Sequence, residues 1–214
     1  MINFFKNTVI STYLFVTSLV ISIVITLNIS PLLYKIFLYF SKIDYLYGMN
    51  KESILNDYSK IILYFNSLSK DYLSFDNFKM SITGKIHFLE VKQIFSVIYL
   101  ILLICLFVGI FFTIIVKKLD YQVPLLTLNI FFYESLLFFC LLFFCLYLNF
   151  SKVFIYFHKI FFKNNYWLFD SIKDPIIKFL PESYFLFLTI FTLILLIFFS
   201  IVSKIVYMHL KHQK

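Results

Sequence analysis

The chain has 214 residues, of which 62% are hydrophobic and 31 are Phe. Soluble domains are roughly 45–50% apolar, so this composition excludes an ordinary soluble domain and indicates a protein that is solvated by a lipid bilayer. The formal net charge is +8, and all 19 cationic side chains are Lys. Because these Lys residues form no basic helix or stripe, the charge argues against nucleic acid as a partner and favours contact with anionic membrane lipids.

Four apolar runs are long enough to cross a bilayer as helices, which takes about 20 residues. They lie at roughly 8–29, 94–116, 123–149 and 183–203. The first run is too long for the apolar core of a signal peptide, so we interpret it as a retained anchor that ends at Pro31. The sequence therefore predicts an all-α membrane protein with four transmembrane helices, in a single integral membrane domain over residues 1–214.

Two long connections, 30–93 and 150–182, separate the predicted spans. With four spans, both connections must lie on the same side of the membrane, whichever way the protein inserts. Lys117 and Lys118 lie in the short connection between the second and third spans, and the positive-inside rule is most reliable for short loops. We therefore expect both termini in the cytoplasm and a small, mainly helical extracellular cap formed by the two long connections.

The first long connection contains an amphipathic segment at 51–68. Its apolar residues recur at helical spacing and form one face, which predicts a helix. They are Ile54, Leu55, Tyr58, Ile61, Ile62, Phe65 and Leu68. The alternation of apolar and polar residues at 78–82 is compatible with a short strand. Aromatic residues at helical spacing over 154–162 predict a helix that continues from the third span, followed by irregular structure.

Two His residues are the best candidates for chemistry. His87 and His158 lie in the two long connections and therefore on the same side of the membrane, each next to a predicted span and flanked by aromatic residues. Imidazole titrates near neutral pH and therefore serves readily as a general acid or base. Either His alone could be a polar side chain at a wet boundary, but two together make a catalytic pair an equal alternative. Glu90 follows His87 by three residues, so it can orient that imidazole or simply favour a helix N-terminus.

Other polar groups give weaker signals. Glu134 lies inside the third predicted span, where an acid is costly and is either functional or hydrogen-bonded within the bundle. All three Cys lie in apolar runs, so neither a disulfide nor a zinc site is expected. Asp170 or Glu90 could add a third ligand to the two His, but no metal-ligand spacing is present and we expect no metal.

Several short segments around the two His residues form a pattern that extends over nearly the whole chain. They are 78–81 and 84–92 around His87, then 157–162, 167–170, 174–175 and 180–182 around His158, with a weaker upstream element at 57–58. These segments resemble the two signatures of the lipoprotein intramolecular transacylases (Lit), whose layout of spans and long connections is also similar. The chain departs from the pattern at Asn165, where an acid is expected, and at Ser171, where Pro is expected.

The resemblance implies a bacterial cell-membrane enzyme that needs no cofactor and acts on diacylglyceryl-modified lipoproteins, with membrane lipids around it. The implied reaction is an intramolecular acyl transfer. The sn-2 acyl chain moves from the glyceryl group onto the α-amino group of the same N-terminal Cys. The product is an N-acyl, S-monoacylglyceryl lipoprotein, which is the lyso-form.

This chemistry suggests roles for the candidate residues. An α-ammonium group has a pKa near 8, so a base must deprotonate it before or during its attack on the ester. We hypothesise that His158 is this base and His87 its partner, although the sequence does not fix their order. The candidates for holding the lipid head group and the peptide are Tyr58, Lys92, Trp167 and Asp170. For Trp167 and Lys92, anchoring at the membrane surface is an equal alternative.

Two other functions stay open at this point. A non-catalytic membrane module that binds lipid or a partner protein would need neither His residue. A small transporter is favoured only by Glu134, because the spans lack the paired broken helices and the repeat symmetry of many transporters.

Overall fold

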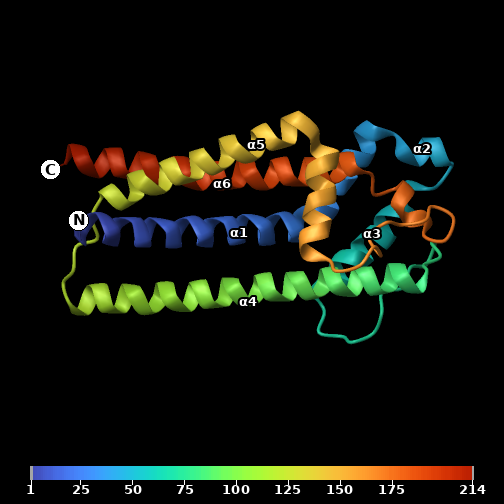
Figure 1. Cartoon of the computed structure of the whole chain (residues 1–214), viewed down its shortest axis with the longest axis horizontal. Coiled ribbons are helices and arrows are strands. Elements are labelled where there is room, and N and C mark those ends of the chain that lie inside the picture. Colours follow the sequence, from blue (N-terminus) through green and yellow to red (C-terminus); the bar gives the residue numbers. More distant parts are fainter. Residues whose placement is uncertain (1, 214) are drawn as a thin grey trace. The chain divides into compact units, whose positions relative to one another are not determined.

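The computed structural model describes residues 2–213, apart from the side chains of residues 2–4, 45 and 46. Its elements are α1 (Ile2–Ser41), α2 (Ile43–Tyr47), α3 (Lys51–Asn66), α4 (Ile82–Lys118), α5 (Leu126–Phe161), the 3-10 helix η1 (Pro175–Lys178) and α6 (Glu182–His212) (Figure 1). No strand occurs among residues 2–213, and 78–81 is irregular. The prediction of an all-α fold is confirmed, whereas the short strand considered at 78–82 is absent from the described residues. Residues 1 and 214 lie outside the described residues.

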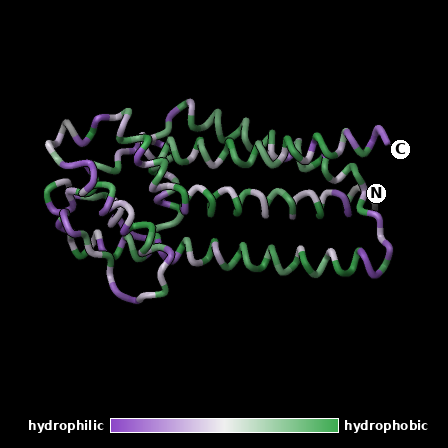
Figure 2. The backbone as a smooth tube through the Cα atoms, turned by 180° about the vertical axis from the view of Figure 1, so that it is seen from behind, coloured by the Kyte–Doolittle hydropathy of each residue, from purple (hydrophilic) through white to green (hydrophobic). Residues whose placement is uncertain are grey.

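Four of the helices are long and apolar enough to cross a membrane, namely α1, α4, α5 and α6. Figure 2 shows the hydrophobic colouring that runs along them. Each of the four apolar runs predicted from the sequence corresponds to one of these helices, and only residues 123–125 of the third run precede their helix, so the prediction of four spans is confirmed. The helices α1, α4 and α6 extend beyond their runs at both ends and α5 at its C-terminal end, and α4 in particular begins at Ile82 and not near residue 94. As a result His87 lies on this helix.

The prediction that the first helix ends at Pro31 is wrong. Pro31 lies inside α1, which continues to Ser41. Proline lacks the N–H that would donate to the carbonyl four residues earlier, here that of Leu27. The Ser30 hydroxyl donates to this same carbonyl at 2.7 Å. A neighbouring side chain therefore satisfies the acceptor that proline leaves free, as helices in membranes require.

The chain divides into two compact units. The first, which we call the bundle unit, consists of Met1–Val24, Ile98–Leu148 and Ile190–Lys214. The second, which we call the loop unit, consists of Ile25–Val97 and Asn149–Thr189 and contains most of both long connections. That the two units form one domain stays a prediction.

Within the bundle unit, Glu134 joins two helices. Its Oε1 atom accepts hydrogen bonds from the hydroxyls of Ser11 at 3.0 Å and Thr12 at 3.3 Å, so α5 is tied to α1. Its Oε2 atom is buried without a hydrogen-bond partner among the described residues. The contacts favour the interpretation that this acid supports the packing of the bundle.

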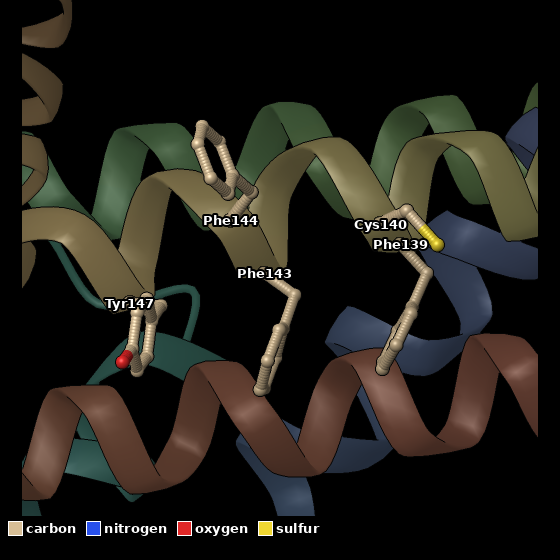
Figure 3. A pocket seen from close by; sticks show the side chains of 5 residues that line it. All are labelled: Phe139, Cys140, Phe143, Phe144 and Tyr147. Carbon is tan, nitrogen blue, oxygen red and sulfur yellow. The ribbon is translucent and has the colours of Figure 1, made fainter.

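The bundle unit also carries an apolar pocket on α5. It is lined by Phe139, Cys140, Phe143, Phe144 and Tyr147 (Figure 3). In Figure 3 the rings of Phe139 and Phe143 project from one side of the helix and Phe144 from the other. Phe143, Phe144 and Tyr147 are all exposed in the protein. An exposed aromatic surface of this kind suits contact with lipid chains.

The loop unit is built around α3, the amphipathic helix predicted at 51–68. Asn50 caps its start, accepting the Glu52 N–H at 3.0 Å, and the helix ends at Asn66. Most of the predicted apolar face is buried, namely Ile54, Tyr58, Ile61, Ile62 and Phe65. Leu68 is fully exposed, because Ser67 is extended and ends the helix before it. The helix prediction is confirmed except for this last turn.

Candidate active site

The position of His87 in the loop unit follows from the way α4 begins. Ser81 precedes the helix and caps it: its hydroxyl accepts the Gly84 N–H at 3.0 Å, which satisfies one of the free amides of the first turn. His87 lies one turn after Gly84 and is buried, with 6% of its surface exposed. A capped, regular first turn thus holds the imidazole on a rigid element.

The position of His158 is set by a break in α5. Asn149 has extended dihedral angles (φ −168°, ψ 93°), and its side chain accepts the Lys152 N–H at 2.9 Å, so it caps a new helical segment. His158 lies in this segment and is buried. Its Nδ1 atom is 2.7 Å from the Phe154 carbonyl oxygen. A carbonyl only accepts hydrogen bonds, so we assign the proton to Nδ1, and Nε2 becomes the nitrogen that can accept a proton.

The two imidazoles lie side by side in an aromatic enclosure. Their ring centroids are 6.0 Å apart. Phe162 contacts both rings, at 4.6 Å from His87 and 5.6 Å from His158. Trp167 stacks on His158 at 4.8 Å, and Phe169 meets His87 edge-on at 5.4 Å. The structure therefore brings together two proton-transfer groups within an apolar lining, where electrostatic interactions are stronger than in water.

Glu90 lies beside His87, as the spacing suggested. Its Oε2 atom is 3.9 Å from His87 Nδ1, and neither atom has a hydrogen-bond partner among the described residues. The other carboxylate oxygen accepts a hydrogen bond from the Asn164 side-chain amide at 2.6 Å. The carboxylate is thus held close to the imidazole, and a small side-chain rotation would let it accept the Nδ1–H. Sequence reasoning missed Asn164, because its role depends on a contact between distant segments.

Tyr58, a predicted substrate-binding residue, is part of a buried network. Its hydroxyl accepts a hydrogen bond from the Tyr184 hydroxyl at 2.7 Å, and its ring stacks on Tyr34 at 4.2 Å. Burial raises the pKa of Tyr58 to about 12, so the phenol is neutral at physiological pH. Only 4% of Tyr58 is exposed. These contacts favour a role in stabilising the loop unit over direct contact with a substrate.

Lys92 is also held inside the loop unit. Its ammonium donates to the Ser67 hydroxyl at 2.9 Å and to the Ser69 carbonyl at 2.7 Å, and it lies 4.2 Å from the Tyr64 ring centroid. The three N–H donors of the ammonium are therefore largely engaged by the segment that follows α3. These contacts hold Lys92 against a loop of the protein, which is neither the substrate binding predicted for it nor the alternative of anchoring at the membrane surface, and its role in binding substrate stays a prediction.

The remaining two predicted substrate residues differ in position. Trp167 belongs to the aromatic enclosure through its stacking on His158. Asp170 is exposed, and its carboxylate accepts the Ile172 N–H at 2.8 Å within a local turn. Of the four predicted substrate residues, Trp167 alone contacts either His ring among the described residues. No three His, Cys, Asp or Glu side chains of the described part lie together as metal ligands would.

The fold and the site together define a class of protein: a polytopic membrane protein with a buried pair of His residues suited to proton transfer. The family model described as "Lipoprotein intramolecular transacylase Lit" matches residues 8–185. The chain therefore belongs to the Lit family. This confirms the resemblance seen in the sequence and makes the protein a bacterial membrane protein of an acyltransferase family.

Solved structures agree with this assignment. The membrane integral lipoprotein intramolecular transacylase Lit from Bacillus cereus is 26% identical, matches 99% of this chain and 97% of its own, and superimposes with a TM-score of 0.88. Two variants of that protein, in which a histidine is replaced by alanine or by arginine, are also 26% identical, with TM-scores of 0.80 and 0.78. The alanine variant covers 99% of this chain and 94% of its own, and the arginine variant 97% and 93%. Among curated proteins, no match was found.

Proposed function

We propose that this protein transfers the sn-2 acyl chain of a diacylglyceryl-modified lipoprotein onto the α-amino group of the same N-terminal Cys. The product is the N-acyl, S-monoacylglyceryl lyso-form. The observation that carries the proposal is the orientation of His158, whose Nδ1–H donates to the Phe154 carbonyl and leaves Nε2 available as a base. His87 is the second proton-transfer group, at 6.0 Å between ring centroids.

The reaction needs two proton movements. The substrate α-ammonium carries three N–H protons; the amide product keeps one, the released glycerol hydroxyl receives one, and one passes to solvent. In the proposed mechanism His158 Nε2 accepts a proton from the amine as its nitrogen attacks the ester carbonyl. The amide C–N bond then forms while the ester C–O bond breaks, and His87 donates its ring N–H proton to the leaving glycerol oxygen. The proton that His158 accepted then restores the N–H of His87, so that both rings return to their starting state. Proton transfer by positioned side chains contributes about 10²–10⁴-fold to such reactions.

The surroundings of the pair support this role. The aromatic rings of Phe162, Trp167 and Phe169 line the two imidazoles, which suits an acyl ester and excludes water that would hydrolyse it. Because the acyl donor and the acceptor amine belong to one molecule, holding them in register avoids the entropy cost of a bimolecular reaction. No cofactor is needed for this chemistry. Glu90 supports His87, and Trp167 is the residue best placed to hold the substrate.

The membrane placement belongs to the same proposal. Mature bacterial lipoproteins present their lipidated Cys at the outer face of the cell membrane, so the His pair is proposed to lie at the extracellular face, with both termini in the cytoplasm. The Lys117 and Lys118 pair at the end of α4 supports this orientation. Membrane lipids surround the four apolar helices in this arrangement.

The proposal is tested by expressing the protein in a bacterium whose lipoproteins keep a free α-amine. Mass spectrometry of a lipoprotein's N-terminal lipopeptide is expected to show the N-acyl, S-monoacylglyceryl form, which has the same mass as its precursor but gives different fragment ions. A well-expressed protein that leaves the diacylglyceryl form unchanged would contradict the proposal. That result would favour a non-catalytic module that binds lipid or a partner protein.

A further inference from the structure

We propose that Asp174 is a positioning residue for His87 and that it acts through Ser81 and Gly84 at the start of α4. The inference rests on the proposed function, since it concerns the geometry of the same His pair. The contact between these residues joins the two sequence signatures, because Ser81 and Gly84 belong to the first signature and Asp174 to the second. We call these three residues the α4 clamp.

The carboxylate of Asp174 is buried, with 2% of the residue exposed. One carboxylate oxygen accepts the Ser81 N–H at 2.7 Å, and the other accepts the Ser81 hydroxyl at 2.8 Å. The same hydroxyl accepts the Gly84 N–H at 3.0 Å, so one serine links the carboxylate to the first turn of α4. Hydrogen bonds to a charged acceptor are stronger than neutral ones, and a negative charge at a helix N-terminus is stabilising.

Gly84 allows this close approach. A Cβ atom at this position would lie 2.6 Å from Asp174 Oδ1 and 3.1 Å from Phe169 Cε1. Both distances are shorter than van der Waals contact, so any larger residue would push α4 away from the segment that contains Phe169 and Asp174. The absence of a side chain at residue 84 therefore sets how closely these two parts of the loop unit pack.

The clamp controls the geometry of the His pair because both of its sides carry active-site groups. On α4, His87 follows Gly84 by one turn and lies on the same side of the helix. On the other side, Phe169 contacts the His87 ring at 5.4 Å, and Trp167 stacks on His158 at 4.8 Å. Separating the helix from this segment would therefore move His87 relative to His158. Misplacement of reacting groups by about 1 Å can cost on the order of 10²-fold in rate.

The test uses the purified full-length protein in detergent with a synthetic diacylglyceryl lipopeptide as substrate. The variants are Asp174→Ala, Asp174→Asn, Gly84→Ala and the double variant Gly84→Ala/Asp174→Ala. Two matched controls are used. Asp71→Asn changes an exposed carboxylate of the loop unit. Gly109→Ala lies in the same helix as Gly84, and its added Cβ would meet the Tyr13 hydroxyl in the bundle unit. Thermal unfolding reports whether each variant is folded.

We expect Asp174→Ala and Gly84→Ala each to lower kcat by about 10- to 100-fold with KM changed less than about twofold. Asp174→Asn, which keeps one acceptor oxygen, is expected to retain more activity than Asp174→Ala. Because both residues act through one contact, the double variant should lose no more activity than the worse single variant. The NMR signal of the His87 ring, which is shifted by the Phe169 ring, should move in Asp174→Asn and stay in place in Asp71→Asn.

The outcomes separate the two proposals. If the wild type is active and the clamp variants keep wild-type kcat, the positioning role proposed for the α4 clamp is refuted and the proposed function stands. Equal loss of kcat in Gly109→Ala, or additive losses in the double variant, would also overturn the clamp, since the effect would then be general destabilisation. An inactive wild type would instead refute the proposed function and the clamp with it. If Asp174→Ala does not fold, Asp174→Asn and its His87 signal decide the question.

Discussion

Replacing His158 with alanine is expected to lower kcat for acyl transfer by about 10²–10⁴-fold, the usual contribution of a general base. The Nδ1–H of this ring is engaged by the Phe154 carbonyl, so the variant removes the nitrogen that is oriented to accept the amine proton. The substrate would still be held by the aromatic enclosure, and KM should change little. The measurement is the initial rate of N-acyl lipopeptide formation, followed by mass spectrometry.

A control separates this effect from a general need for histidine. His209 lies in the last turn of α6, in the bundle unit, so His209→Ala should keep wild-type activity. Raising the pH supplies more free amine without the base, so the deficit of His158→Ala is expected to shrink above the pKa of the α-ammonium group, which is near 8. Retention of more than half of the wild-type kcat by His158→Ala at neutral pH would contradict its role.

Replacing His87 with alanine is expected to produce the second large loss, of about 10²–10³-fold in kcat. This variant removes the proposed donor to the leaving glycerol oxygen and opens a space beside Phe162 and Phe169. His87→Gln keeps a hydrogen-bond donor but cannot exchange a proton, so its activity should lie between that of the wild type and that of His87→Ala. The comparison requires equal amounts of folded protein, measured by size-exclusion chromatography.

The pair of variants also tests the division of roles. A substrate with a better leaving group than glycerol should restore activity to His87→Ala, because protonation of the leaving oxygen then matters less. The same substrate should leave the deficit of His158→Ala in place. If the restoration occurs in His158→Ala instead, the roles of the two His residues are exchanged.

Much of the fold could be predicted from the sequence, because its signals are local. Apolar runs of membrane-spanning length gave the four long helices, and helical spacing in 51–68 gave α3 with its buried face. Parity alone placed His87 and His158 on one side of the membrane, and the structure places their rings 6.0 Å apart. The prediction that the first helix ends at Pro31 was wrong, because the rule that proline ends helices takes no account of the Ser30 hydroxyl, which donates to the carbonyl that Pro31 leaves free.

The roles of individual site residues could not be predicted as well, because they depend on which distant segments meet. Tyr58 and Lys92 look like substrate ligands in the sequence, yet Tyr184 and the Ser67–Ser69 segment occupy their polar atoms. Asp174 precedes a proline and resembles an ordinary turn residue. Only the fold shows that its carboxylate reaches Ser81 at the start of α4.

The most direct test of the central claim is a crossover experiment with the purified protein. Two diacylglyceryl lipopeptides of different peptide mass are mixed, one with a deuterated sn-2 chain and an unlabelled sn-1 chain, the other unlabelled. Mass spectrometry of the products reads which chain is on the amine and from which molecule it came. The mechanism proposed for the His pair predicts that deuterated N-acyl chains occur only on the peptide that began with the label. Label on the other peptide, or an amide formed from the sn-1 chain, would contradict intramolecular transfer of the sn-2 chain.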